Sequence, residues 1–151
     1  MVTAPQVAIR PCEERDLDHF GAFGSDLHVQ YCRAELTHPR KVLLVAVSED
    51  DLPVGKLHIH LDYSADAVWL EAAAVARPRQ SQGIGTSLVR AAEAFAGERG
   101  YRLAELGVED SNPRARRLYE RLGYQSIARH DFQYTGAPVP NPGVVMRKEL
   151  A

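Results

Sequence analysis

A glycine-rich segment between two apolar stretches constrains the fold of this chain more than any other feature. Residues 80–86 read Gln-Ser-Gln-Gly-Ile-Gly-Thr and follow an apolar run at 68–76. They open a segment whose apolar residues recur at helical spacing through residue 95. This order predicts a strand, a tight turn and a helix. Because the first N–H groups of a helix have no partner within it, the turn can bind a phosphate.

The two glycines of this turn, Gly83 and Gly85, are the residues that a phosphate site would require. A Cβ atom at either position would hold the phosphate away from the backbone. Glycine also adopts the φ angles of a tight nest of N–H groups without strain. The alternative is an ordinary loop that contains two convenient glycines, and the choice between them depends on the rest of the sequence.

Composition predicts one globular domain, residues 1–151, with a core of ordinary size. Hydrophobic residues make up 45% of the chain and charged residues 25%, which is average for such a domain. The net charge of −2 argues against a general nucleic-acid or membrane-surface role, because those roles need a basic field. No apolar run approaches the roughly 18 residues of a membrane span. We therefore expect neither nucleic acid nor a membrane as a partner.

The N-terminus and the cysteines favour a cytoplasmic protein. Residues 1–5 contain no basic segment followed by an apolar one, so we expect no signal peptide. Cys12 and Cys32 are the two cysteines, and they are not spaced as a CxxC motif. Two inert thiols are a better interpretation than a disulfide framework.

The hydropathy pattern places further elements along the chain. It predicts strands at 7–11, 41–47, 54–61, 67–75, 103–108, 124–132 and 144–150, and helices at 13–23, 25–36, 84–99 and 113–122. Ser25 and Asn112 are the expected N-caps, and Gly100 and Gly123 the expected stops. The fold class is α+β: a mixed, mostly antiparallel central sheet of about six to seven strands with helices on both faces.

Two motifs at a fixed separation resemble a known family. The first consists of Val75, Gln80, Gly83, Ile84 and Gly85, and the second of Leu106, Gly107, Val108, Asn112, Ala115, Leu118, Tyr119, Glu120, Gly123 and Tyr124. They are similar to motifs A and B of the GCN5-related N-acetyltransferase (GNAT) superfamily. The order of elements agrees along nearly the whole chain. Gln80 stands where arginine is commoner, which leaves the backbone N–H groups of the turn unchanged.

The resemblance implies acetyl-CoA as the donor of an acetyl group. Its pyrophosphate would bind the N–H groups of the glycine-rich turn, and its pantetheine arm would pair with the backbone of the preceding strand. The implied cofactor-binding residues are Ala73, Ala74, Val75, Gln80, Gln82, Gly83, Ile84, Gly85, Thr86 and Asn112. The alanines have an alternative explanation, tight packing beneath a helix, and helix capping alone accounts for Asn112.

Glu71 is the candidate general base. An alkylammonium, with a pKa near 10.4, must lose a proton before its nitrogen can attack a thioester. Strand alternation places Glu71 on the face of Trp69 and, barring a bulge, Ala73. Desolvation there would raise the pKa of the carboxyl group. The alternative is a solvated glutamate, or one that only orients the substrate.

Tyr119 is the candidate general acid. A phenol can donate a hydrogen bond to the leaving thiolate and reprotonate it. The resemblance places the acid tyrosine of the family at this position. The alternative is a core aromatic, because Tyr119 lies beside the apolar stripe that contains Leu118 and Leu122.

No metal site is expected. His58, His60 and Asp62 share one face of a strand, and a His-x-His pair can bind a metal. A third ligand and a chemical need are missing, so a polar sheet face is the simpler interpretation. One or both histidines could instead line the acceptor cleft or transfer its proton.

The acceptor site should be built from the first two helices, the turn at Tyr63 and the loop at 135–143. Its expected negative lining consists of Asp26, Glu35, Asp62 and Glu71. The predicted function is acetyl-CoA-dependent transfer of an acetyl group to a primary amine of a small molecule, peptide or protein, by direct attack in a ternary complex. The alternatives are a non-catalytic acyl-CoA-binding regulatory module and an acyltransferase that uses a longer acyl-CoA. The exposed final strands could pair with a second copy of the chain, so a homodimer stays open.

Overall fold

The computed structural model describes residues 7–133 and 138–151. Its elements, in chain order, are β1 (Ala8–Pro11), η1 (Glu14–Ala22), α1 (Asp26–Leu36), β2 (Lys41–Val47), β3 (Pro53–His60), β4 (Ala67–Val75), η2 (Arg77–Arg79), α2 (Ile84–Glu98), β5 (Leu103–Glu109), α3 (Pro113–Arg121), β6 (Gln125–Phe132) and β7 (Asn141–Glu149). The N-terminal segment on which the signal-peptide expectation rests lies outside the described residues. Part of the predicted acceptor loop at 135–143 lies outside them too.

The predicted strands and helices are confirmed, and η2 is a short additional 3₁₀ helix that was not predicted. Two of the predicted elements differ in type or bounds. The first helix is a 3₁₀ helix, η1, and not an α-helix. A loop was predicted to continue through residue 143, but β7 already begins at Asn141 because residues 141–143 pair with β6. The caps are as predicted: the Asn112 side chain accepts from the Ala115 N–H at 3.1 Å, and Gly100 and Gly123 have φ angles of 88° and 100°.

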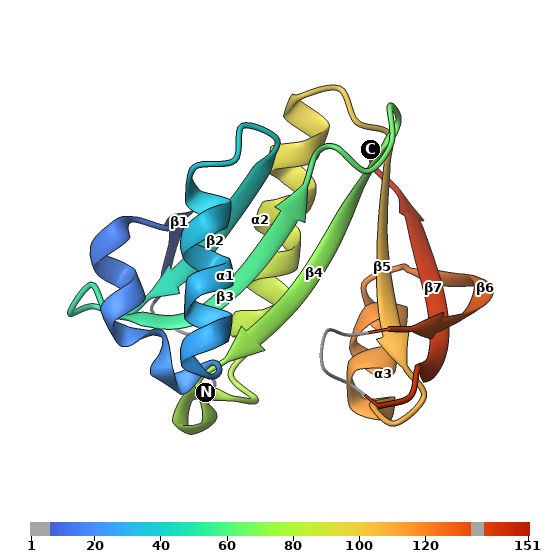
Figure 1. Ribbon diagram of the computed structural model, residues 1–151. Helices are drawn as coiled ribbons and strands as arrows, with labels where there is room; N and C mark the ends of the chain where they lie inside the picture. Colours follow the sequence, from blue (N-terminus) through green and yellow to red (C-terminus); the bar gives the residue numbers. More distant parts are fainter. Residues whose placement is uncertain (1–6, 134–137) are drawn as a thin grey trace, which may run out of the picture.

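One seven-stranded sheet, in the order β1-β2-β3-β4-β5-β7-β6, forms the centre of the molecule (Figure 1). β4 and β5 are its one parallel pair within the described residues, and the other neighbours are antiparallel. The mixed, mostly antiparallel sheet that the sequence predicts is therefore confirmed. None of the described helices is long and apolar enough to cross a membrane.

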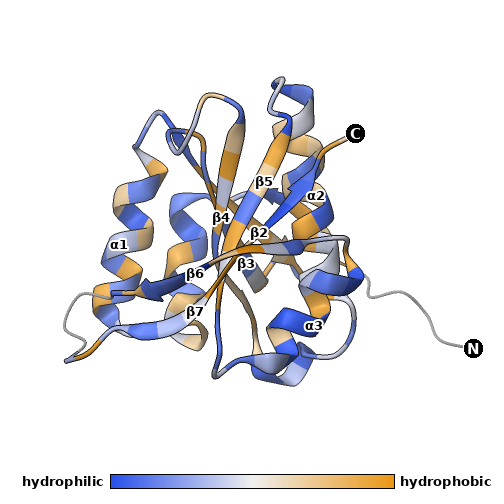
Figure 2. Cartoon of the chain, turned by 90° about the vertical axis from the view of Figure 1, so that its right-hand side faces the viewer, coloured by the Kyte–Doolittle hydropathy of each residue, from blue (hydrophilic) through white to orange (hydrophobic). Residues whose placement is uncertain are grey.

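Helices cover both faces of the sheet, as predicted. On one face α2 and α3 cover the larger core, to which Ile84, Leu88 and Ala92 contribute the inner stripe of α2. On the other face η1 and α1 cover a smaller core around Phe20 and Cys32. Figure 2 shows the hydrophobic colour concentrated on the central strands, whereas the helices alternate between hydrophilic and hydrophobic segments.

β4 and β5 diverge along their length, and this divergence positions the site. Their pairing runs from Ala67 opposite Leu103 to Leu70 opposite Leu106 and stops there. In Figure 1 the two strands meet at one end and separate toward the ends of their arrows. Among the residues that the structure describes, no strand therefore pairs with residues 71–75 of β4 on the side of β5, although β3 still pairs with their other edge.

A β-bulge at Ala72 corrects one prediction about β4. His58 lies opposite Glu71 and Lys56 lies opposite Ala74, so that Leu57 faces two residues of β4. Ala72 has a φ angle of 55°, which marks the extra residue of the bulge. Because opposite residues of an antiparallel pair share a face, Ala74 and not Ala73 lies on the face of Glu71.

Candidate active site

A cavity of about 1010 Å³ lies where β4 and β5 diverge. α1 forms one wall, and β4, β5 and α3 form the others. Its lining comprises Ser25, Leu27, His28, Gln30, Tyr31, Leu57, Trp69, Leu70, Glu71, Ala72, Ala73, Leu106, Gly107, Val108, Glu109, Asn112, Ala115, Tyr119, Phe132 and Gln133. Four of the predicted site residues, Glu71, Ala73, Asn112 and Tyr119, therefore share one cavity. Ala72 and Ala73 are exposed to it, so the Ala run is not explained by packing beneath a helix.

The glycine-rich turn forms the expected start of α2, beside the C-terminal end of β4. Gly83 is the N-cap with a φ angle of 82°, and no side chain caps the helix. The first helical hydrogen bond runs from the Ser87 N–H to the Gly83 carbonyl at 3.0 Å. The N–H groups of Ile84, Gly85 and Thr86 thus have no acceptor within α2. Its first turn carries no acidic residue, so the turn is a suitable anion site.

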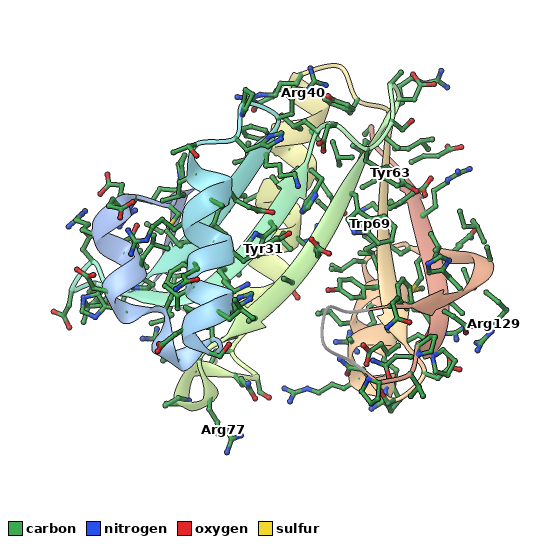
Figure 3. The ribbon with its side chains drawn as sticks, viewed as in Figure 1. Tyr31, Arg40, Tyr63, Trp69, Arg77 and Arg129 are labelled. Carbon is green, nitrogen blue, oxygen red and sulfur yellow. The ribbon has the colours of Figure 1, made fainter. Side chains whose placement is uncertain are left out.

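Side chains around this turn hold it in place. Gln80 donates from Nε2 to the Val75 carbonyl at 3.1 Å, and Arg114 of α3 donates to the Ser81 hydroxyl at 2.6 Å. Two further arginines, Arg77 and Arg79, precede the turn, and Figure 3 shows Arg77 projecting beyond the end of β4. Arg79 and Arg114 therefore bring positive charge to the turn through their bonds to Gln82 and Ser81.

The turn and the cavity are neighbours but not one pocket. A Cβ atom at Gly85 would lie 3.9 Å from Val75 and 3.8 Å from Leu118, which is ordinary packing distance. One at Gly83 would meet open space. Ala74, Val75 and the predicted turn residues Gln80, Gln82, Gly83, Ile84, Gly85 and Thr86 do not line the cavity. The glycine-rich turn, a candidate anion site, thus lies at one end of β4, and the cavity lies along the same strand.

Glu71 lies in the cavity wall, but its electrostatics differ from the prediction. His60 Nε2 lies 2.8 Å from Glu71 Oε2, and the Tyr31 hydroxyl donates to the same oxygen at 3.2 Å. The hydrogen bond from His60 outweighs desolvation and lowers the pKa of Glu71 below its ordinary value. The predicted rise in this pKa is therefore wrong. The side chain is 39% exposed and faces the cavity as a carboxylate.

Tyr119 reaches the same cavity from α3. Its ring packs edge-on against Tyr124, with the ring centroids 5.9 Å apart. Desolvation raises the pKa of its phenol, so the proton stays on the oxygen at neutral pH. Tyr119 therefore contributes both to packing and to the cavity wall, where a protonated phenol can serve as a donor.

A buried polar network that could not be predicted from the sequence lies between α1 and the sheet. His58 and Glu35 are 0% and 3% exposed, and His58 Nδ1 lies 2.5 Å from Glu35 Oε2. Lys56, also buried, places its Nζ 2.9 Å from His58 Nε2 and donates to the Ala72 carbonyl at 2.9 Å. His58 does lie on a polar face of the sheet, but α1 covers this face, so the side chain is buried.

The acceptor side of the cavity differs in its residues from the prediction. Among the expected acidic residues only Glu71 lines it, since Glu35 is buried and Asp26 and Asp62 lie elsewhere. Of the first two helices, α1 contributes and η1 does not. Tyr63 instead donates to Glu105 at 2.7 Å and stacks near Trp69. The described lining contains no lysine or arginine and has two carboxylates, those of Glu71 and Glu109.

Tyr31, Glu109 and Phe132 are cavity residues that the sequence analysis missed. Figure 3 labels Tyr31 on α1 and Trp69 on β4, which both line the cavity. Gly107 offered a signal for Phe132, because a Cβ atom at Gly107 would lie 2.5 Å from its ring. A glycine at position 107 indicates that another group packs closely against the backbone, but it does not show that this group is Phe132.

A mixed sheet that opens between two parallel strands, next to an uncapped glycine-rich helix start, defines a class of acyl-CoA-dependent transferases. Residues 9–124 match the Acetyltransferase (GNAT) family, which is more than half of the chain. The chain belongs to this family, and it is an N-acetyltransferase by class. The family uses acetyl-CoA as its donor. No curated protein sequence matches the chain.

Several solved structures share the fold. The ribosomal-protein-S18-alanine N-acetyltransferase from Escherichia coli is 19% identical with a TM-score of 0.79, over 97% of this chain and 95% of that one. A spermidine N-acetyltransferase SpeG chimera from Vibrio cholerae and hSSAT is 16% identical with a TM-score of 0.80, over 96% of each chain. An aminoglycoside 6'-N-acetyltransferase complexed with coenzyme A is 18% identical with a TM-score of 0.75, over 95% and 97%. At these identities the likeness concerns the fold.

Proposed function

We propose that this chain, acting as one domain, transfers the acetyl group of acetyl-CoA to a primary amine of a small molecule, peptide or protein. The observation that carries the proposal is the shared cavity of Glu71 and Tyr119, which adjoins the uncapped start of α2. This arrangement offers a proton acceptor, a proton donor and an anion site along one strand. A non-catalytic CoA-binding module would need no such pair.

The donor would bind along the divergent edge of β4. Its pyrophosphate would accept hydrogen bonds from the N–H groups of Gln82 to Thr86, in the field of the nearby arginines. Its pantetheine arm would lie along Ala73, Ala74 and Val75, where β4 has no partner on the side of β5. The Gln80 side chain would support the turn from the Val75 carbonyl, and Asn112 would face the arm from the start of α3.

The chemistry proceeds by direct attack in a ternary complex. The neutral amine nitrogen forms a bond to the thioester carbonyl carbon, and the C–S bond breaks as the tetrahedral intermediate collapses. Glu71 accepts the proton that the amine gives up, directly or through a water, and His60 holds its carboxylate in place. Tyr119 donates a proton to the leaving thiolate, so that CoA departs as a thiol.

The lining of the cavity favours an amine that arrives as a cation. It combines the carboxylates of Glu71 and Glu109 with the aromatic rings of Tyr31, Trp69 and Phe132. Carboxylates attract an ammonium group, and aromatic faces stabilise a cation by roughly 0.5–2 kcal/mol. The solved relatives named above are described as acting on an alanine of a ribosomal protein, spermidine and an aminoglycoside. All three acceptors present amines.

The two cysteines support a cytoplasmic location for this activity. Cys12 and Cys32 are both free thiols, as is usual in a reducing compartment. The edge strand β6 is exposed along almost its whole length, so a homodimer through this edge is part of the proposal.

Thiol release from acetyl-CoA across a broad panel of amines, with CoA binding measured in parallel by calorimetry, tests the function. We expect turnover with one class of cationic amine. Propionyl-CoA and butyryl-CoA, run beside acetyl-CoA, distinguish a longer-acyl enzyme. Tight CoA binding without turnover on any amine would favour the regulatory module, and absence of CoA binding would contradict the anion site itself.

A further inference from the structure

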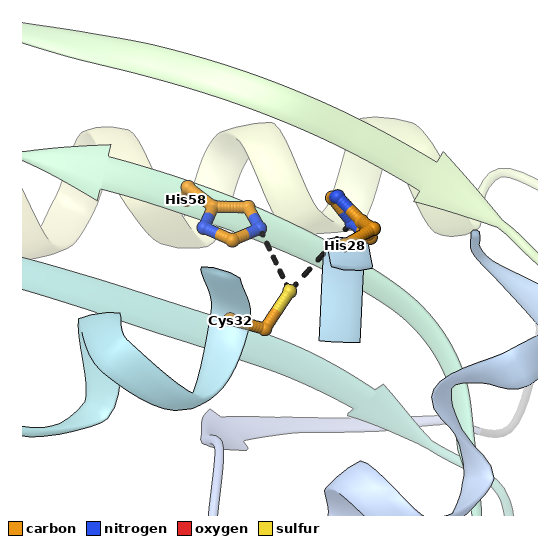
Figure 4. A group of neighbouring side chains, drawn as sticks. All are labelled: His28, Cys32 and His58. Atoms are coloured by element: carbon orange, nitrogen blue, oxygen red, sulfur yellow. Dashed lines mark hydrogen bonds between the residues drawn. The ribbon is translucent and has the colours of Figure 1, made fainter. Parts of the chain in front are cut away.

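Three side chains with metal-binding atoms meet beneath the wall of the cavity. His28 and Cys32 lie one helical turn apart on α1, and His58 lies on β3, which α1 covers. Cys32 Sγ is 3.6 Å from His28 Nε2 and 3.8 Å from His58 Nε2. Figure 4 shows the sulfur between the two imidazole rings. All three atoms lie within 4.8 Å of one another.

The two sulfur–nitrogen separations approach those of a tetrahedral zinc site. Zinc binds sulfur at about 2.3 Å and imidazole nitrogen at about 2.0–2.1 Å, which places the two ligand atoms about 3.5–3.6 Å apart. The observed sulfur–nitrogen distances exceed this by a few tenths of an ångström or less. We propose that His28, Cys32 and His58 bind one divalent transition-metal ion of the zinc type. This proposal does not depend on the acetyl-transfer chemistry.

Glu35 already orients one of these ligands. Its Oε2 lies 2.5 Å from Nδ1 of His58, and both side chains are buried. A carboxylate at Nδ1 fixes the ring so that Nε2 is the free ligand atom, and Nε2 is the atom that faces Cys32. The arrangement of carboxylate, histidine and metal is common in zinc proteins.

The site is also accessible from the cavity. His28 lines the cavity, so an ion and a fourth ligand such as water reach the cluster from there. Cys32 is 0% exposed and therefore cannot act as a surface nucleophile. Metal coordination is a role that a buried cysteine beside two histidines can fill. On binding, the thiol loses its proton to solvent and the sulfur coordinates as thiolate.

Lys56 is the competitor for this site. Its Nζ lies 2.9 Å from His58 Nε2, where it occupies the direction that an ion needs. It also donates to the Ala72 carbonyl, so it can release His58 and keep one hydrogen bond. Substitution of Lys56 by an apolar residue of similar length removes the ammonium group and should therefore strengthen metal binding.

Titration of the chelator-stripped full-length chain with Co²⁺, followed by displacement with Zn²⁺, tests the proposal. A cobalt–thiolate bond gives charge-transfer absorption in the near ultraviolet, and tetrahedral coordination gives intense visible bands. We expect one ion per chain. Cys32→Ser should lose the charge-transfer band and weaken binding at least about 100-fold, since even a second-shell partner is worth about 10–100-fold. His28→Ala should weaken binding to a similar extent.

Two further variants make the test discriminating. Cys12→Ser removes the other thiol and should leave the cobalt spectrum unchanged. Lys56→Met should bind at least about tenfold more tightly, and circular dichroism without metal verifies that each variant is folded. The proposal is overturned if the wild-type chain shows no thiolate band, if Cys32→Ser keeps it, or if Lys56→Met binds no more tightly than wild type.

Discussion

Tyr119 lines the cavity and its ring also packs against Tyr124, so its two roles can be separated. Tyr119→Phe keeps the ring and removes the proton donor. We expect kcat to fall about 100-fold or more with little change in acetyl-CoA affinity, because the donor acts on the leaving thiolate. Steady-state kinetics and CoA titration measure both quantities.

Tyr63→Phe is the matched control for this variant. It removes a phenol hydroxyl that bonds to Glu105 outside the cavity lining, and it should leave turnover unchanged. Full turnover in Tyr119→Phe would remove Tyr119 from the acid role.

His60 sets the protonation of Glu71, and a substitution can reveal it. The pKa of Glu71 lies below its ordinary value because His60 donates to it. His60→Leu removes this bond and leaves desolvation, which favours the neutral acid, so the pKa should rise. The Glu71 carboxylate would then protonate at higher pH, and the acidic limb of kcat/KM would move upward. ¹³C NMR titration of the carboxyl group measures the same shift directly.

Two comparisons complete this experiment. Glu71→Gln should abolish the acidic limb, and its retention would indicate another base or water. His19→Leu, at an exposed histidine of η1, should leave the profile in place. An unmoved Glu71 titration in His60→Leu would contradict the role of His60.

Among the secondary-structure elements, the start of α2 contains two glycines, Gly83 and Gly85, whose substitution should have different effects on stability. A Cβ atom at Gly85 meets only ordinary packing distances in the free protein, whereas Gly83 has a left-handed φ of 82°. Gly85→Ala should therefore keep the melting temperature and weaken CoA binding about tenfold or more, because the new methyl group obstructs the phosphate. Gly83→Ala should also destabilise the fold by about 1–2 kcal/mol.

Gly97 near the end of the same helix supplies the control. Gly97→Ala should leave CoA affinity unchanged and stabilise α2 by up to about 1 kcal/mol. Calorimetric CoA titration measures the CoA affinity of the three variants, and thermal unfolding measures their stability. Unaltered CoA affinity in Gly85→Ala would place the pyrophosphate elsewhere.

At the scale of the whole molecule, an ion pair attaches the N-terminal layer to the sheet. Asp16 of η1 is 2% exposed, and Arg10 of β1 donates to its two carboxylate oxygens at 2.7 and 2.9 Å. Desolvation raises the pKa of Asp16, but the bonds from Arg10 and the Glu13 N–H outweigh it and lower this pKa overall. The stabilisation is thus present above the ordinary pKa, near 3.9, and is lost as pH falls through the lower folded value.

Asp16→Asn should reduce the free energy of unfolding by about 1.5–3 kcal/mol at neutral pH, as expected for hydrogen bonds to a charged group. The difference from wild type should shrink as the pH falls below about 4. Urea unfolding across pH measures it, with the exposed Asp18→Asn as control. A difference that does not depend on pH would show that the ionised carboxylate is not its source.

The fold class, the order of elements and the glycine-rich turn could be predicted from local patterns of residues. Strand and helix periodicities, helix caps and positive φ angles are written in short windows of sequence, so β4, α2 and α3 could be predicted with nearly correct bounds. The local chemistry of the turn was also predictable, because unpaired N–H groups follow from any helix start.

The environment of the site residues depends on tertiary packing and could not be predicted in this way. Whether His58 is solvated or buried depends on α1, which is far from it in sequence and covers its face of the sheet. The pKa of Glu71 depends on His60 and Tyr31, and the bulge at Ala72 changes which alanine shares its face. His28 and Cys32 reach His58 only because α1 packs on β3. Such contacts depend on how the elements pack in three dimensions, which no local pattern of residues encodes.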